Sequence, residues 1–78
     1  DLDDIVEYVR ETYNQAISVY EYEDFVRVTN GSAAHKADIC VSDGRLSIAA
    51  QRYGEYYDDV HEPTTDGLQN ALSKGLGL

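Results

Sequence analysis

The segment from Ala37 to Ala50 constrains the fold more than any other part of the chain. Asp43-Gly44 separates two runs of β-forming residues, and this dipeptide favours a type I′ turn because both central residues need a positive φ. The turn fixes the register, since a slip of one residue would move apolar side chains to the other face. The apolar face is expected to contain the pairs Val41–Leu46, Ile39–Ile48 and Ala37–Ala50.

A lone hairpin is marginal in water, so other segments must cover its apolar face. Apolar residues recur at helical spacing from about Asp3 to about Ser18, and aspartates in the first turn suit the helix dipole. A second helix is expected after Pro63, with an apolar stripe at Leu68, Ala71, Leu72 and Leu76. Its expected caps are Thr64, Thr65 or Asp66 at the start and Gly75 at the end.

The segment Val19–Thr29 is rich in β-forming residues and is expected to be one strand, with a bend near Glu23-Asp24. A loop is expected through Asn30–His35, a turn at Gly54 and a short extended piece at Val60–Glu62. The sequence therefore predicts a single α+β domain that spans residues 1–78. Its order is helix, three-stranded antiparallel β-meander, helix (αβββα), with the helices on one face of the sheet.

The chain is acidic, with fifteen Asp and Glu against six Lys and Arg in 78 residues and a net charge of −9. Direct binding to nucleic acid or to an anionic membrane is not expected, because both need clustered basic residues. No apolar run approaches the roughly 18 residues of a membrane span. The single cysteine fits a reducing compartment, and we expect a cytoplasmic location. The acidity suits a salty cytoplasm, or alternatively a surface that mimics nucleic acid and inhibits a basic protein.

The residues that could support catalysis or metal binding follow no known motif. Cys40, His35, His61 and Glu62 are suitable zinc ligands by type, but His35 and Cys40 would point to opposite faces of one strand. A Cys40–His61 nucleophile pair would need the fold to bring the two together. We therefore expect no enzyme, no cofactor and no metal site.

Tyrosines are the most informative polar feature, since seven of the eight aromatic residues are Tyr. Tyrosine combines a large apolar ring with a polar tip and is enriched at protein interfaces. The leading hypothesis is thus a small protein-interaction domain, which acts as a monomer or as a homodimer. The alternative is that these rings only cover the edge of a small core. The expected partner surface contains Tyr20, Tyr22, Tyr53, Glu55, Tyr56, Tyr57, Asp58 and Asp59.

Two resemblances bear on these expectations. The opening DLDDIVEYVRETY followed by VYEYEDFVRV resembles the start of small, acidic, uncharacterised haloarchaeal proteins, which implies a high-salt cytoplasm but no activity. The expected helix–three strands–helix order is similar to the double-stranded-RNA-binding domain, which holds phosphates with basic residues where its last helix begins. In this chain Asp66 lies where the last helix is expected to begin, and the only basic residue of that helix, Lys74, lies near its far end. Only the topology would therefore be shared.

We predict that the domain becomes more stable as salt rises, because salt screens the repulsion among its surplus carboxylates. Thermal unfolding measured from low to molar KCl should show a rising midpoint. A midpoint that stays flat or falls would contradict the salt-adapted interpretation of the acidity.

Overall fold

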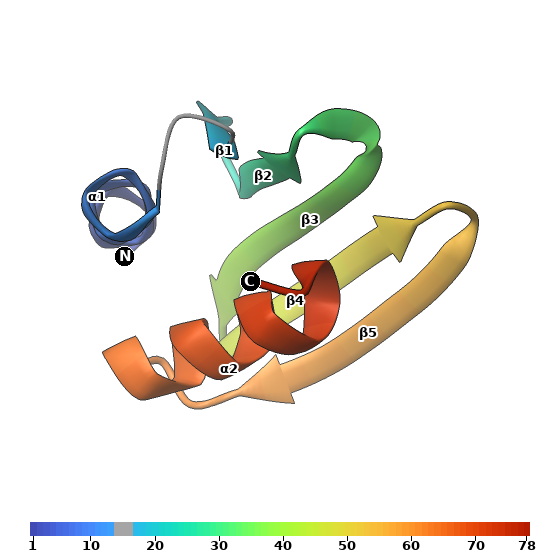
Figure 1. Ribbon diagram of the computed structural model, residues 1–78. Helices are drawn as coiled ribbons and strands as arrows, with labels where there is room; N and C mark the ends of the chain where they lie inside the picture. The colour runs from blue at the N-terminus through green and yellow to red at the C-terminus, as the bar shows by residue number, and fades with distance from the viewer. Residues whose placement is uncertain (14–16) are drawn as a thin grey trace.

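The computed structural model describes residues 1–13 and 17–78, which form five strands and two helices. The five strands make one antiparallel sheet in the order β1-β2-β3-β4-β5, and both helices pack on the same face of it (Figure 1). Each strand is thus hydrogen-bonded to the strand that follows it in the sequence. The elements are α1 (Leu2–Thr12), β1 (Ile17–Glu21), β2 (Val26–Asn30), β3 (Ser32–Ser42), β4 (Arg45–Arg52), β5 (Glu55–His61) and α2 (Thr65–Leu76).

The central hairpin has the register that its turn predicts. Asp43 and Gly44 have φ values of 53° and 71°, as a type I′ turn requires. Ser42 pairs with Arg45 across this turn. The remaining predicted pairs, Val41–Leu46, Ile39–Ile48 and Ala37–Ala50, also form.

The core lies between the apolar face of the sheet and the two helices. α1 covers β1 and β2, whereas α2 covers β3, β4 and β5. Ile39, Leu46 and Ile48 are fully buried in this layer, together with Val26, Val28, Val9 and Leu72. Val41 was expected in the core but is 42% exposed, because it lies near the end of β3, where the two helices leave a cleft.

The expected three-stranded meander is wrong, because the sheet has five strands. The segment expected as one bent strand forms β1 and β2, joined by a turn in which the Tyr22 N–H donates to the Phe25 carbonyl at 2.9 Å. The expected loop through Asn30–His35 is also wrong. A tight turn at Gly31 leads directly into β3, and an irregularity at Thr29-Asn30 shifts the register so that Val26 pairs with Ile39.

The turn expected at Gly54 is confirmed, but the fifth strand that follows it was missed, because the first turn residue and the side-chain pattern of the strand are both unusual. Tyr53-Gly54 forms the turn with φ values of 50° and 86°, but tyrosine is a rare residue in a position that favours Asn, Asp or Gly. β5 also has polar residues on its covered side, where Tyr57, Asp59 and His61 pair with Ala50, Ile48 and Leu46. Apolar alternation therefore gives no signal for this strand.

The helix ends differ in part from the expected ones. Asp1 caps α1 through a capping box with Asp4, but α1 ends at Thr12 and β1 already begins at Ile17. The expected helical residues 14–16 lie outside the described residues. Thr64 caps α2, as expected, by accepting a hydrogen bond from the Gly67 N–H at 3.1 Å. The C-terminal cap is Gly77, not Gly75.

Two glycines of α2 let this helix lie very close to its surroundings. A Cβ at Gly75 would lie 2.9 Å from Ile48 Cδ1 and 3.0 Å from Ala50 Cβ, both on β4. A Cβ at Gly67 would overlap the backbone carbonyl of Glu62. The absence of a side chain at these positions therefore sets the distance between α2 and the sheet.

We predict that Gly67→Ala lowers the free energy of unfolding by about 1–3 kcal/mol, because the new methyl group overlaps rigid backbone. Helix propensity by itself would favour alanine over glycine by up to about 1 kcal/mol, so the overlap acts against this gain. Gln69→Ala, at an exposed position of the same helix, is the matched control and should change stability by less than about 0.5 kcal/mol. Urea unfolding measures both. A more stable Gly67→Ala variant would contradict the close contact.

Candidate functional site

The tyrosine–carboxylate segment predicted as a partner surface forms the β4–β5 turn and most of β5, which is an edge strand of the sheet. Successive side chains of a strand point to opposite faces, so Tyr56 and Asp58 lie on the face without helices. Tyr57 and Asp59 lie on the face that α2 covers. Tyr53 and Tyr56 are 78% and 77% exposed, whereas Tyr57 is half-buried against the core. We call Tyr53, Glu55, Tyr56 and Asp58 the β5 hairpin surface.

Tyr53 stands at the tip of this hairpin and is held there by its backbone. Its N–H donates to the Ala34 carbonyl at 3.1 Å, and its ring meets the His35 ring edge-to-face at 4.3 Å between centroids. These contacts tie the tip to β3 while leaving most of the ring in solvent. The exposed ring is thus presented by a fixed turn.

Tyr20 and Tyr22 do not join this surface. They lie on or just after β1, and β2, β3 and β4 separate that edge from β5. Tyr22 stacks on Phe25 with 4.7 Å between ring centroids, and the Arg27 guanidinium lies 5.6 Å from both rings. Arg27 in turn makes two hydrogen bonds to Asp38, of 2.7 and 3.0 Å. The predicted surface is therefore divided between opposite edges, and the Tyr22 ring already has an internal cation partner.

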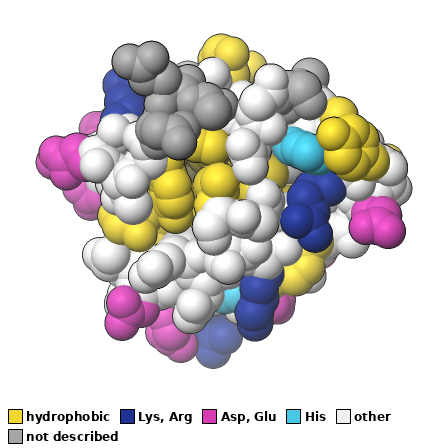
Figure 2. All heavy atoms as spheres, in the orientation of Figure 1, with side chains coloured by type: hydrophobic (Ala, Val, Ile, Leu, Met, Phe, Trp, Pro, Cys, Tyr) yellow, Lys and Arg dark blue, Asp and Glu magenta, His cyan; other side chains and the backbone are white. Residues whose placement is uncertain are grey.

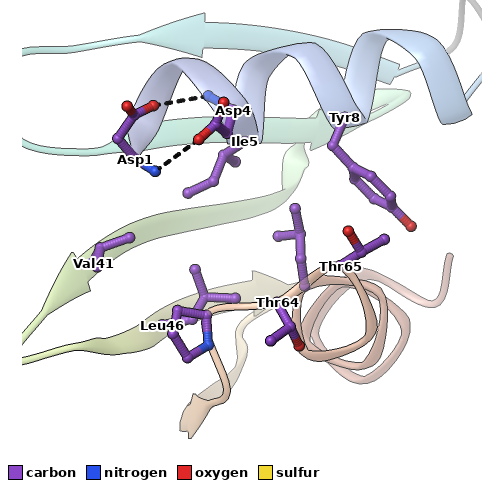
Figure 3. Close-up of a pocket in the computed structure, with 10 residues that line it drawn as sticks. Asp1, Asp4, Ile5, Tyr8, Val41, Leu46, Thr64 and Thr65 are labelled. Carbon is purple, nitrogen blue, oxygen red and sulfur yellow. Dashed lines mark hydrogen bonds and ion pairs between the residues drawn. The ribbon is translucent and has the colours of Figure 1, made fainter.

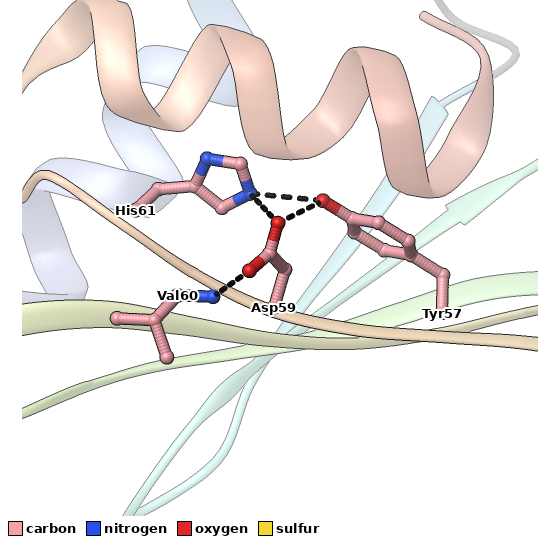
Figure 4. Close-up of polar contacts among 4 residues, drawn as sticks. All are labelled: Tyr57, Asp59, Val60 and His61. Carbon is pink, nitrogen blue, oxygen red and sulfur yellow. Dashed lines mark hydrogen bonds and ion pairs between the residues drawn. The ribbon is translucent and has the colours of Figure 1, made fainter.

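Three polar side chains of β5 converge beneath α2 (Figure 4). The Tyr57 hydroxyl lies 2.9 Å from Asp59 Oδ2 and 3.1 Å from His61 Nε2, and Nε2 lies 3.6 Å from the same carboxylate oxygen. The Tyr57 hydroxyl donates to the Asp59 carboxylate, and the imidazole tautomer sets the direction of its second hydrogen bond, with His61 Nε2. The His61 side chain is 9% exposed and that of Asp59 is 48% exposed.

The same contacts set the ionisation of the cluster. The Val60 N–H, 2.8 Å from Asp59 Oδ1, and the Tyr57 hydroxyl both hold the pKa of Asp59 below its ordinary value. Burial and then the hydrogen bond to Asp59 raise the pKa of Tyr57. The carboxylate therefore remains charged and the phenol neutral, and the cluster satisfies the polar groups at the margin of the core.

The cluster does not extend to the one thiol. Cys40 pairs with Ser47 and points to the face of the sheet that the helices do not cover, which we call the open face. His61 pairs with Leu46 and points beneath α2. The Cys40–His61 pair considered from the sequence is therefore not formed. His35 and Cys40 also lie on opposite faces, as their spacing in β3 predicts.

A cleft between the two helices was not foreseen from the sequence. Its volume is about 350 Å³, and its lining includes Val41 and Leu46 of the sheet, Ile5 and Tyr8 of α1 and Leu68 of α2 (Figure 3). Figure 2 shows hydrophobic side chains at the surface between the helices on this face. The cleft exists because α1 and α2 cover different strands, which the periodicity of neither helix reveals.

Comparison with protein-family models, with curated protein sequences and with solved structures finds no match to this chain. Within the described residues, neither helix is long and apolar enough to cross a bilayer. The same part of the chain holds no group of three His, Cys, Asp or Glu side chains placed to bind one metal ion.

We predict that Asp59→Asn flattens the acid limb of the stability curve. The folded-state pKa of Asp59 is lowered, so its contribution is present above the unfolded value of about 3.9 and is lost as pH falls through the folded-state pKa. Urea unfolding between about pH 7 and pH 2.5 should therefore show a smaller loss below about pH 4 in the variant. Asp58→Asn, on the opposite face, controls for removing a nearby charge. Parallel curves for Asp59→Asn and wild type would contradict the assignment.

Proposed function

We propose that the chain is a small, non-enzymatic protein-interaction domain of the cytoplasm that binds a basic protein through the β5 hairpin surface. The observation that supports this most directly is the exposure of Tyr53 and Tyr56, which are 78% and 77% accessible on an ordered turn and strand. Neither ring contributes to the core cluster, so folding does not require a tyrosine at either position. Exposed aromatic residues of this kind are typical of contact surfaces.

The charges around these rings favour a basic partner. Asp58 lies on the same face of β5 as Tyr56, whereas Glu55 and Asp59, whose side chain is 48% exposed, point to the α2 face of the same edge. A guanidinium or ammonium group placed over Tyr56 would gain a cation–π contact and an ion pair with Asp58 on the same face. The overall charge of −9 would also steer a basic protein toward the domain.

Mimicry of nucleic acid, the alternative function, fits this arrangement less well. A mimic needs carboxylates in rows on one surface, but Asp58 and Asp59 point to opposite faces of β5. The open face also carries Arg27, Lys36 and Arg45 beside Asp38 and Asp58, so it is not strongly acidic. A surface with exposed aromatic rings and mixed charges is more typical of a protein contact than of a nucleic-acid mimic.

Site-specific photocrosslinking tests the proposal. A benzoylphenylalanine residue in place of Tyr56 should form an adduct with a basic protein in cells, and the same residue in place of the exposed Glu7 on α1 should not. Mass spectrometry identifies the adduct. No adduct at position 56, equal adducts at both positions, or an adduct with a second copy of the chain would each overturn the proposed partner class.

We predict that Tyr56→Ala weakens binding to the crosslinked partner about tenfold, or 1–2 kcal/mol, because an exposed aromatic anchor is lost. Its free energy of unfolding should change by less than about 0.5 kcal/mol, since the ring lies outside the core. Calorimetric titration and urea unfolding measure the two quantities. Tyr20→Ala, on the opposite edge of the sheet, is the control and should leave binding unchanged. A loss of stability that matches the loss of binding would make Tyr56 a structural residue.

A further inference from the structure

The backbone of β5 has an orientation that bears on how a partner binds. In an antiparallel pair, alternate residues direct both N–H and C=O toward the neighbouring strand, and the residues between them direct these groups away. The Val60 N–H reaches its own neighbour Asp59 at 2.8 Å, so it points away from β4. Alternation then places the N–H and C=O groups of Tyr56 and Asp58 on the outer side of the edge as well.

The hairpin turn gives the same result independently. A two-residue turn closes on a hydrogen-bonded pair, here Arg52 and Glu55. Counting from Glu55, the residues bonded to β4 are Tyr57, Asp59 and His61. Tyr56, Asp58 and Val60 are therefore the outward residues. Of their N–H groups, only that of Val60 takes part in a turn, loop or side-chain hydrogen bond among the described residues.

Edge strands in folded proteins are commonly protected by charged side chains, above all lysine, and by proline, a bulge or a covering element. The carboxylates of β5 repel another acidic strand, but they do not repel a basic one. β5 has neither lysine nor proline, and its pairing with β4 continues without a register shift over seven residues. The Asp59 carboxylate blocks only the Val60 N–H. The outer edge at Tyr56 and Asp58 can therefore accept the backbone of another strand.

The opposite edge is less suited to this role. β1 has five residues, against seven in β5. At the end of β1, the neighbouring Asp3 carboxyl of α1 raises the pKa of Glu21, so this edge lies beside the first helix. Of the two edges, β5 is thus the longer and the more open.

We propose that the partner contributes an extended basic segment that pairs with β5 as a sixth strand of the sheet. This inference rests on the proposed function and specifies its binding mode. Carboxylates flank the edge at Glu55, Asp58 and Asp59, so a strand with Arg or Lys beside them forms favourable cross-strand pairs. A second copy of β5 would instead bring two sets of these carboxylates together, which disfavours self-pairing.

A matched pair of variants at position 58 isolates the backbone contribution. Asp58→Ala and Asp58→Pro both remove the carboxylate, but only proline also removes the outward N–H. Proline is tolerated on an edge strand where the N–H faces solvent, so the fold should persist. The probe is an eight-residue peptide of alternating arginine and threonine with blocked ends. We expect Asp58→Ala to weaken its binding by less than tenfold and Asp58→Pro to weaken it at least tenfold further.

Two measurements on the unaltered protein keep the proposal testable if Asp58→Pro fails to fold. The bound peptide should slow hydrogen exchange of the Tyr56 and Asp58 amides, while those of Tyr57 and Asp59, already bonded to β4, should change little. Two peptides can be made with N-methyl groups at alternate residues, one at the odd and one at the even positions. Only the peptide whose methyl groups replace the N–H groups that face β5 should lose binding.

The outcomes separate the binding mode from the proposed function. Peptide binding without amide protection, or with equal affinity for the alanine and proline variants, would overturn strand addition and leave the hairpin surface as a side-chain contact. A peptide that does not bind the wild-type protein would also overturn strand addition by a basic segment. Crosslinking at position 56 decides the proposed function in either case.

Discussion

The one-sided apolar pattern of the β3–β4 hairpin is the constraint on which the rest of the structure depends. Ile39 and Ile48 face each other and are fully buried, whereas Cys40 and Ser47, one position along, face the other way. Because only one face is apolar, both helices must pack on that face. β2 extends the same face with Val26 and Val28, and no helix of the described residues lies over the opposite face of the sheet.

The position of α2 follows from this constraint and in turn shapes the β5 edge. Gly67 and Gly75 let the helix approach Glu62 and β4 closely, so little space remains above the last strand. The covered side of β5 holds Tyr57, Asp59 and His61, whose polar atoms bond to one another beneath the helix. A polar group at the margin of a core is tolerated when it is hydrogen-bonded, so this strand needs no apolar alternation.

The distribution of charge is set by strand geometry as much as by composition. Neighbouring carboxylates such as Asp58 and Asp59 are separated to the two faces of β5, which spreads their repulsion. One of them, Asp59, is used internally through Tyr57 and the Val60 N–H. The Asp58 carboxylate has no such internal role and lies beside the outward N–H and C=O groups of Tyr56 and of its own residue. The edge therefore combines hydrogen-bonding capacity, an exposed ring and negative charge within one short strand.

The sequence by itself determined the features that depend on neighbours along the chain. These are the type I′ turn at Asp43-Gly44, the register that it imposes, a second helix that begins just after Pro63, and the opposite directions of Tyr56 and Tyr57. Tertiary structure decided the number of strands, because β5 is stabilised by pairing with β4 and by contact with α2 and not by its own pattern. It also decided that Tyr20 and Tyr22 lie across the sheet from the β5 hairpin surface, since strand order is not encoded locally. Local rules fix turns, caps and alternation, whereas the partner of an edge strand is chosen by long-range packing.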